Sequence, residues 1–591
     1  MGAHLKRAVA LVIGAFVLYT ATEGPFDALV QRSVMVALVV TLGFLSYPLK
    51  LSGRARIVSL AIDLLLWAGT MAACLYVTFS ANWIMTSLPM AGPVEIALAA
   101  VLVVTLLELA RRTVGIAFPI LVLVGFAYVF LGHLIPGRLG HRGYDILFVT
   151  ETLYLSDIGV WGSLTGIAST IIAAFVLFGA MLLRTGGGDT FMDLALLVSG
   201  RTIGGAAKMA TVASASFGTV NGSAVANVAT TGTMTIPLMK RIGYPAPIAA
   251  AVEAVVFLSI HLIALRQKIG YVPPEEIPSA RTALAPVRLV PVVFGLGGLL
   301  WMLISGRSVA LSAATGVICM IVPFVIADLA ITRRPIETAK TLLGGLVEAG
   351  NGIVIIALML AGAQILVSLI NLTGVGVTLS SLTVAIGGES SVLVGLIVAV
   401  ACLVLGMGIP TTAAYVLVAA VMAPALIAIG IEPLVAHMFV FYYATISVIT
   451  PPVCIAVFVA ASIAKTDWWP AALNAVRLGA VTYVVPFMFL SYPGMLWSGT
   501  PIEIAEAALS SATLVLATSL FLSGTTVRDS RMLAAALYIP AAVLAIVPSE
   551  VALVVAIVLT GAGLALGRPF RHPPEFRPGA DPAAATADAA G

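Results

Sequence analysis

The sequence predicts an all-α polytopic membrane protein with roughly 15 helical spans. Two observations lead to this fold class. Of the 591 residues, 61% are hydrophobic and only 9% are charged, which is more apolar surface than one soluble core can bury. Apolar segments such as "VMVALVVTLGFL" and "IALAAVLVVTLLELA" also recur along nearly the whole chain, and each is typical of a helix that crosses a bilayer. We therefore expect the lipid bilayer to surround most of the chain.

The charged residues indicate membrane topology rather than a nucleic-acid interface. The net charge is +4, and the basic residues stand in short clusters between apolar segments. These clusters include Arg111 with Arg112, Lys240 with Arg241, and Arg333 with Arg334. Such clusters mark the cytoplasmic ends of spans, so we expect no nucleic-acid partner.

The character of the apolar segments changes along the chain. Residues 1–112 hold four plain hydrophobic segments, whereas from 113 to 496 Gly, Ser, Thr and Pro enter the segments themselves. Residues 497–567 hold three plainer segments, which we interpret as additional C-terminal membrane helices. Residues 568–591 are rich in Pro and Ala and are expected to form a disordered tail.

Two segments of the middle region predict hairpins of broken helices. The first lies near residues 208–245 and contains "GTVNGSAVANVATTGT"; the second lies near 402–433 and contains "GMGIPTTAAYVLVAAVMAPALIAIGIEP". Each has a Gly- and Thr-rich tip, an apolar return with a Pro, and then an Ile-Gly turn. Paired interruptions of this kind are typical of transporters with inverted repeats and re-entrant hairpins, whose binding site lies near the membrane midplane.

The polar residues of the two tips are candidates for sodium binding. Irregular backbone lies at membrane depth only where it is buried in protein or lines a wet cavity, and there its carbonyls and nearby hydroxyl and amide oxygens replace the water of an ion. We predict one site at each tip. The candidate ligands are Gly218, Asn221, Gly222, Ser223 and Asn227 at the first tip, and Gly406, Gly408, Thr411, Thr412 and Thr450 at the second.

An anionic substrate group is expected between the tips, because the N-termini of half-helices favour negative charge. The candidate substrate-binding residues are Thr230, Thr231, Pro410 and Pro451. For one such segment alone, the spacing of Gly218 and Gly222 would favour simple helix packing. Two matched segments with Pro interruptions reverse that preference.

A longer stretch gives the chain a specific resemblance. "NGSAVANVATTGTMTIPLMKRIGY", preceded by "GGAAKMATVASASFGT", resembles the fused permease of tripartite ATP-independent periplasmic (TRAP) transporters. In that permease a small four-helix subunit and a large twelve-helix, DctM-like subunit form one chain. "LELARRTVGIAFPI", "FVLFGAMLLRTGGGDTFMDLAL" and "ITPPVCIAVFVAASIA" support the resemblance, which spans nearly the whole chain up to the C-terminal helices.

The resemblance implies an elevator-type, sodium-coupled importer that crosses the bacterial cytoplasmic (inner) membrane several times. It implies a periplasmic solute-binding protein as partner and a small carboxylate, a dicarboxylate or related organic acid, as substrate. In these terms residues 1–112 form a small-subunit-like four-helix scaffold, and residues 113–496 form a large-subunit-like transport region. The two tips correspond to the re-entrant hairpins of the family.

One departure from the family pattern concerns the first repeat. The "TPP" at residues 450–452 lies 17 residues beyond Pro433 and predicts a second broken helix. The same distance beyond Pro247 reaches "HLIAL", which has no Gly-Pro interruption.

Charge supports a gap at this place. The basic clusters at Lys240 and Arg266 both prefer the cytoplasmic side, yet only one helix's worth of residues separates them. The hypothesis is an internal deletion near residues 254–256, which leaves residues 246–266 as a fused remnant of two helices and impairs transport.

Two other functional classes stay open on the sequence alone. A channel or ion-translocating subunit of a larger membrane complex would show rings of like residues or a selectivity loop. A membrane-embedded enzyme would need a nucleophile or metal constellation, and the four cysteines stand singly without His nearby. We therefore expect a secondary active transporter and no enzyme, with sodium as the coupling ion, no transition metal and no other cofactor.

Overall fold

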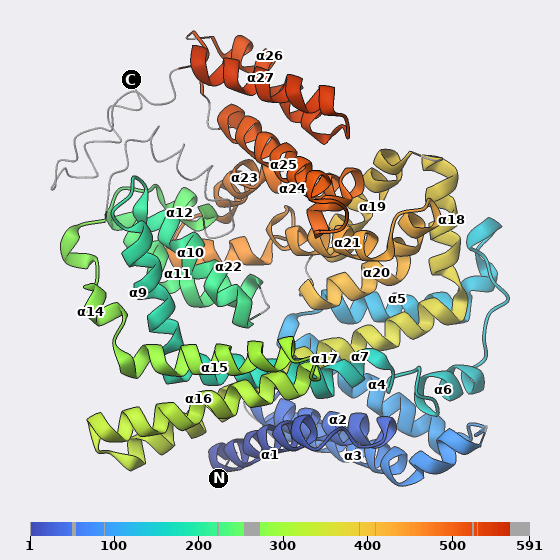
Figure 1. The fold of residues 1–591 in the computed structure, drawn as a ribbon. Coiled ribbons are helices and arrows are strands. Elements are labelled where there is room, and N and C mark those ends of the chain that lie inside the picture. Colours follow the sequence, from blue (N-terminus) through green and yellow to red (C-terminus); the bar gives the residue numbers. More distant parts are fainter. Residues whose placement is uncertain are drawn as a thin grey trace. The chain divides into compact units, whose positions relative to one another are not determined.

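The computed structural model describes residues 2–49, 55–87, 89–221, 224–252, 272–388, 390–407, 409, 411–522, 525–528 and 530–567. This part of the chain is built of helices (Figure 1), which confirms the predicted all-α class. Within it, 11 helices, or up to 12 if a bent pair forms one span, are long and apolar enough to cross a membrane. This number is lower than the roughly 15 spans estimated from the sequence, because six further apolar helices in the described residues have only 10–17 residues and are shorter than a usual span.

The helices group into two compact units, and each is discontinuous in sequence. The first unit comprises Met1–Thr190 and Leu284–Leu379, and the second comprises Phe191–Ala283 and Ser380–Gly591. The sequence boundaries at residues 112 and 496, which follow from resemblance to separate subunits, lie inside these units and stay a prediction.

The first unit is organised around one long helix. Its helices are α1 (Gly2–Thr22), α2 (Ala28–Ser46), α3 (Ala55–Thr86), α4 (Pro93–Val114), α5 (Ala117–Leu131), α6 (Ile146–Tyr154), α7 (Ser163–Ile167), α8 (Ala173–Leu182), α15 (Pro286–Ile304), α16 (Val309–Thr332) and α17 (Pro335–Thr373). The π-helices η3 (Ala168–Ile172) and η4 (Leu183–Gly187) flank α8. Helix α17 has 39 residues, is mostly buried and contacts α1, α2, α4, α5 and α8. It is therefore the core of this unit.

Polar side chains join the four N-terminal helices to the rest of the first unit. The Gln31 amide donates to the Ser169 carbonyl at 3.1 Å, and the Tyr154 hydroxyl donates to the Ala73 carbonyl at 2.8 Å. The Ser46 hydroxyl donates to Asn351 on α17 at 3.1 Å. In an apolar surrounding such bonds hold helices together, because the alternative is an unsatisfied polar group.

Charged residues at the ends of α3 and α4 form a closed network. Arg112 lies 2.7 Å from Asp63 and 2.7 Å from Glu108, and Glu108 also pairs with Arg111 at 2.8 Å. The Leu49 backbone amide donates to the other Asp63 oxygen at 3.0 Å. These acidic residues of apolar segments therefore have structural partners within the protein.

The second unit contains the segments that are expected to form hairpins and the C-terminal helices. Its helices are α10 (Gly205–Asn221), α11 (Ala224–Arg241), α12 (Ala246–Val252), α14 (Ala280–Ala283), α19 (Ser391–Gly406), α20 (Thr411–Ala428), α21 (Pro433–Ile446), α22 (Ile455–Ala464), α23 (Trp468–Leu478), α24 (Ala480–Ser491), α25 (Pro501–Leu522), α26 (Arg531–Ile546) and α27 (Glu550–Leu566); α9 (Gly188–Ser199) and α18 (Val375–Gly387) each span a boundary between the units. Helix α10 packs on α11, and α19 packs on α20.

The two hairpins end in the same backbone turn. Helices α11 and α20 have 18 residues each and carry Pro237 and Pro424. Six residues after each proline stands a glycine, Gly243 with φ 103° and Gly430 with φ 90°. In both turns the amide after the glycine donates to the carbonyl five residues back, at 3.0 and 3.1 Å. This is the Schellman motif, and its recurrence supports an internal repeat.

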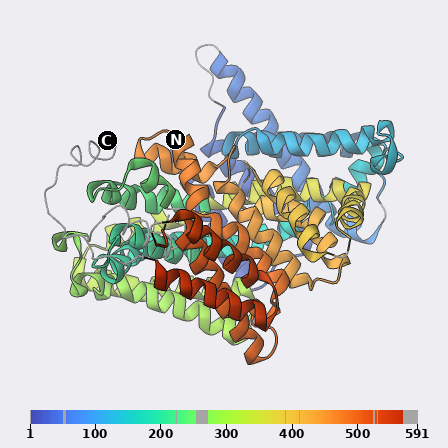
Figure 2. The ribbon, with the colours of Figure 1, turned by 90° about the horizontal axis from the view of Figure 1, so that it is seen from above.

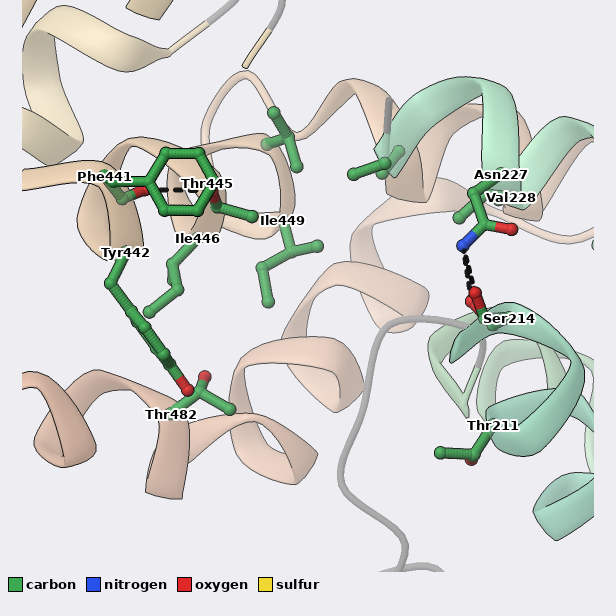
Figure 3. Close-up of a pocket in the computed structure, with 13 residues that line it drawn as sticks. Thr211, Ser214, Asn227, Val228, Phe441, Tyr442, Thr445, Ile446, Ile449 and Thr482 are labelled. Atoms are coloured by element: carbon green, nitrogen blue, oxygen red, sulfur yellow. Dashed lines mark hydrogen bonds between the residues drawn. The ribbon is translucent and has the colours of Figure 1, made fainter. Parts of the chain in front are cut away.

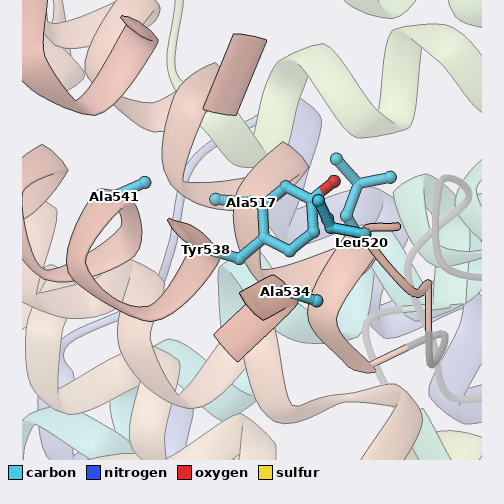
Figure 4. Packing of buried hydrophobic residues seen from close by; sticks show 6 residues of the cluster. Ala517, Leu520, Ala534, Tyr538 and Ala541 are labelled. Atoms are coloured by element: carbon cyan, nitrogen blue, oxygen red, sulfur yellow. The ribbon is translucent and has the colours of Figure 1, made fainter. Parts of the chain in front are cut away.

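The C-terminal helices pack on one another through small residues. Tyr538 of α26 is fully buried against Ala517 and Leu520 of α25 (Figure 4). A Cβ at Gly563 of α27 would lie 2.4 Å from the Tyr538 ring, so a glycine is needed there. Helices α26 and α27 lie side by side in both views (Figures 1 and 2). The predicted disordered tail at 568–591 lies outside the described residues.

Candidate functional site

A cavity of about 440 Å³ lies within the second unit, between the first hairpin and the helices α21, α22 and α24 (Figure 3). This volume is typical of pockets that bind small molecules. The residues that line it are Thr211, Ser214, Ala224, Asn227, Val228, Phe441, Tyr442, Thr445, Ile446, Val448, Ile449, Ala456 and Thr482.

On the hairpin side, Asn227 of α11 faces Ser214 of α10. The Asn227 amide nitrogen donates to the Ser214 carbonyl at 2.9 Å and to its hydroxyl at 2.7 Å. Because a carbonyl oxygen only accepts, this contact fixes which end of the amide faces Ser214. The Asn227 side chain is 9% exposed, and its Oδ1 is buried without a hydrogen-bond partner. A buried oxygen of this kind is an available ligand for a cation.

On the opposite side, a broken helix forms the wall. Helix α21 ends at Ile446, a 3₁₀ turn covers Ser447–Ile449, and the backbone is extended at Thr450 before α22 begins at Ile455. Residues on both sides of this break line the cavity. The interruption predicted from the "TPP" sequence is therefore present in the structure.

Hydrogen bonds to two tyrosines fix the broken helix next to the residues that line the cavity. The Thr450 hydroxyl donates to the Ile446 carbonyl at 2.9 Å and lies 2.6 Å from the Tyr483 hydroxyl. Since the Thr450 proton is used on Ile446, Tyr483 is the donor to Thr450. Tyr443 in turn donates to the Tyr483 carbonyl. The extended segment is thus tied to α24.

Two helices begin at this cavity. Ala224 is the first residue of α11 and Ala456 lies in the first turn of α22, and both line the cavity. Helices α11 and α22 pack against each other. Helix N-termini carry a partial positive charge, so this end of the cavity favours an anion or an anionic group.

The comparison with known families agrees with this geometry. The family model described as "Tripartite ATP-independent periplasmic transporter, DctM component" matches residues 101–256 and 254–504. The chain belongs to this family. It is therefore the membrane component of a TRAP transporter, a multi-pass protein of the inner membrane rather than an enzyme. The family implies a periplasmic binding protein as partner. No curated protein matches the chain at a significant level.

The match has two informative boundaries. Residues 1–100, which include the first three helices, lie outside it, as do the helices α26 and α27. The two matched segments overlap at residues 254–256, so no residue of this permease lies between them.

Of the predicted sodium ligands, Asn227 lines the cavity, and Thr450 follows the lining residue Ile449. A Cβ at Gly218 would lie 3.8 Å from the Asn227 amide nitrogen, which places Gly218 beside it. A Cβ at Gly406 would lie 2.6 Å from the Ser447 hydroxyl, so the second hairpin packs closely on the broken helix.

The other predicted ligands are not among the lining residues or lie outside the described residues. Thr411 is buried at the start of α20, and Thr412 beside it is partly buried. The positions Gly222, Ser223 and Gly408, and the side chain of Asn221, lie outside the described residues. These assignments stay predictions.

The predicted substrate residues are not brought together. Thr231 is buried, and its hydroxyl donates to the Asn227 carbonyl within α11 at 2.8 Å. Thr230 is exposed, Pro451 is partly buried, and Pro410 lies outside the described residues. None of the three that are described is among the residues lining the cavity.

Sequence reasoning missed several polar residues of the cavity. Thr211 and Ser214 lie three apart in "KMATVASASFG", a spacing that puts them on one face of α10, and that signal could have been used. Thr445 and Thr482 are single threonines in apolar helices and carry no comparable signal.

The two hairpins of this permease have the same backbone turn but differ in the polar side chain at the position of Asn227. The same 187-residue offset relates Pro237 to Pro424 and Gly243 to Gly430. At this offset Asn227 corresponds to Ala414. The second hairpin therefore has no counterpart of the amide bridge across the first.

Proposed function

We propose that this chain is the permease of a sodium-coupled, binding-protein-dependent secondary transporter that imports a small carboxylate. The observation that carries the proposal is the buried Asn227 Oδ1 on the cavity wall. A buried acceptor without a partner costs about 1–3 kcal/mol, and a bound cation would offset that loss.

The chemistry of the ligands favours sodium. The described side chains that line the cavity offer neutral amide and hydroxyl oxygens and no carboxylate. Calcium sites in proteins rely on carboxylates, whereas sodium sites in transporters use unwound backbone carbonyls and neutral oxygens. The broken helix around Ser447–Ile449 supplies such a backbone at the cavity.

A carboxylate substrate is supported by the two helix N-termini at Ala224 and Ala456. Their dipoles and a bound sodium ion would together stabilise one negative charge. The same features are expected of a site that receives an anion from a periplasmic binding protein. An elevator-type mechanism requires units that move as bodies, and the division into two compact units supports it.

We also infer that the first repeat lacks part of its second half. Three observations support this inference: the matched segments overlap at 254–256, the basic clusters at Lys240 and Arg266 are one helix apart, and the break after α21 has no sequence counterpart after α12. Residues 253–271 themselves lie outside the described part of the chain. In this account the chain binds sodium but transports poorly.

Thermal unfolding of the purified chain tests the sodium part. The midpoint should rise when sodium chloride replaces potassium chloride at equal ionic strength, because ligand binding stabilises the folded state. Asn227→Ala should abolish most of this rise. Asn474→Ala is a matched control, since its amide donates only within α23, to Pro470 at 2.8 Å. An equal sodium response in wild type and Asn227→Ala would contradict the proposal.

Uptake tests the transport part. Proteoliposomes with an inward sodium gradient, supplied with a periplasmic binding protein that docks on this permease and with the substrate of that binding protein, should show weak uptake by the unaltered chain. A variant in which the missing segment, with the length found in other permeases of the family, is inserted at residue 255 should show sodium-dependent uptake. Full uptake by the unaltered chain would refute the deletion, and sodium-independent uptake by both would refute the coupling.

A further inference from the structure

The cavity has two ends of different chemistry, which Figure 3 shows on either side of the view. At the hairpin end lie Asn227, Ser214 and the start of α11 at Ala224. At the other end lie the side chains of Phe441, Tyr442, Ile446 and Ile449, of which only Tyr442 carries a polar group, its hydroxyl.

The threonine hydroxyls of this end already donate to backbone carbonyls. Thr445 donates to the Phe441 carbonyl at 2.9 Å, and Thr482 donates to the Gly479 carbonyl at 2.5 Å, each within its own helix segment. These threonines therefore offer a ligand mainly their methyl groups.

The hairpin end differs in its free hydrogen-bonding capacity. The Ser214 hydroxyl accepts from Asn227, which leaves its own proton available for a ligand. The Asn227 Oδ1 and the N-termini of α11 and α22 add an acceptor for a cation and two positive dipole ends. The groups at this end can therefore bind one carboxylate together with one sodium ion.

From this asymmetry we infer that the cavity selects a monocarboxylate with an apolar body, branched or aromatic, over a short dicarboxylate. The inference rests on the proposed carboxylate transport and names its substrate class. A second carboxylate would lie against Phe441, Ile446 and Ile449, where the described lining residues offer one tyrosine hydroxyl, that of Tyr442, and no cation. Burying a charge without an opposite charge is strongly unfavourable. An apolar body gains by burial against the same side chains. The volume of about 440 Å³ also exceeds what a four-carbon diacid fills.

The test compares two probes on the purified full chain. Thermal unfolding is followed while 4-phenylbutyrate or succinate is titrated, in sodium chloride and in potassium chloride of equal ionic strength. In sodium, 4-phenylbutyrate should reach half of its stabilising effect at a concentration at least tenfold lower than succinate. In potassium this difference should disappear, which separates the site from non-specific partition of an apolar molecule.

A variant pair gives the second readout. Ile449→Thr places a polar group at the apolar end and should reduce the preference for 4-phenylbutyrate severalfold. Ile539→Thr on the exposed face of α26 is the matched control and should leave the preference unchanged. If Ile449→Thr fails to fold, the ratio of the two probes in wild type still decides the question.

The outcomes separate this inference from the proposed function. Sodium-dependent binding of succinate that is as tight as that of 4-phenylbutyrate would overturn the substrate class and leave sodium-coupled carboxylate transport standing. Stabilisation by neither probe in sodium would overturn both.

Discussion

The side chain of Asn227 spans the two arms of the first hairpin and binds Ser214 twice, at its hydroxyl and at its carbonyl oxygen. Both bonds use the amide nitrogen, so the amide oxygen of Asn227 is left over and buried. The same contact therefore closes the hairpin and orients an oxygen that a cation can use.

The Ser214 hydroxyl should matter for stability more than for sodium. In Ser214→Ala the Asn227 amide still donates to the backbone carbonyl, so its orientation is kept. We expect the free energy of unfolding to fall by about 1 kcal/mol, the worth of one neutral hydrogen bond, and the sodium affinity to change less than threefold. Ser462→Ala, which loses only an exposed bond within α22, is the control and should change neither quantity.

The tie between Tyr483 and Thr450 should set the affinity of the cavity. Tyr483→Phe removes the donor to Thr450 and frees the extended segment behind Ile449. We expect a loss of about 1 kcal/mol of stability together with weaker sodium-dependent ligand binding. Tyr492→Phe removes a similar bond, to the Val547 carbonyl at 2.7 Å, away from the cavity. It should cost similar stability without changing ligand binding; equal effects of both variants on binding would count against the role of Tyr483.

The two equivalent turns should respond alike to substitution of their glycines. Gly243 and Gly430 have positive φ, and no described atom lies within 4 Å of a Cβ built at either position. Alanine at each should therefore cost about 1–2 kcal/mol through backbone strain alone. Gly561→Ala, in the middle of α27 with equally open surroundings, should be neutral or stabilising. Chemical unfolding of the three variants measures the difference, and a neutral effect at Gly243 or Gly430 would contradict the turn assignment.

The charge network of the first unit should depend on Arg112. Its side chain is only 6% exposed and pairs with Asp63 and Glu108. Arg112→Gln leaves the buried Asp63 carboxylate without a cationic partner, whereas Glu108 keeps Arg111, and should destabilise the protein by about 3–5 kcal/mol. Lys340→Gln breaks the exposed pair with Glu337 and should change stability by less than about 1 kcal/mol. Similar losses of stability in the two variants would show that the Arg112 network contributes no more to the free energy of unfolding than an exposed ion pair.

Much of the fold follows from local sequence. The hairpins could be predicted because Pro237 with Gly243 and Pro424 with Gly430 control where helices bend and end, and those signals act within one or two turns. Asn227 could be predicted because an amide in an apolar segment needs a partner or a function. The break after α21 followed from the two prolines after Thr450.

The rest depends on contacts between distant residues. Helices α15–α17 lie between the two hairpins in sequence yet belong to the first unit, a division that no local pattern encodes. Phe441, Thr445 and Thr482 reach the cavity because α21 and α24 pack around it, and their own sequence neighbours are ordinary apolar helix. Thr230 and Thr231 looked similar to Asn227 in sequence, but one faces outward and the other bonds within its helix.

The measurement that tests the central claim most directly is sodium binding to the purified chain, with radioactive sodium displaced by unlabelled sodium, for wild type and Asn227→Ala. Loss of one oxygen ligand to a cation is worth about 1.5–3 kcal/mol, so the account predicts saturable binding in wild type and an affinity about tenfold to hundredfold lower in the variant. Asn474→Ala should bind as wild type does. Equal sodium affinity in wild type and Asn227→Ala would contradict the account.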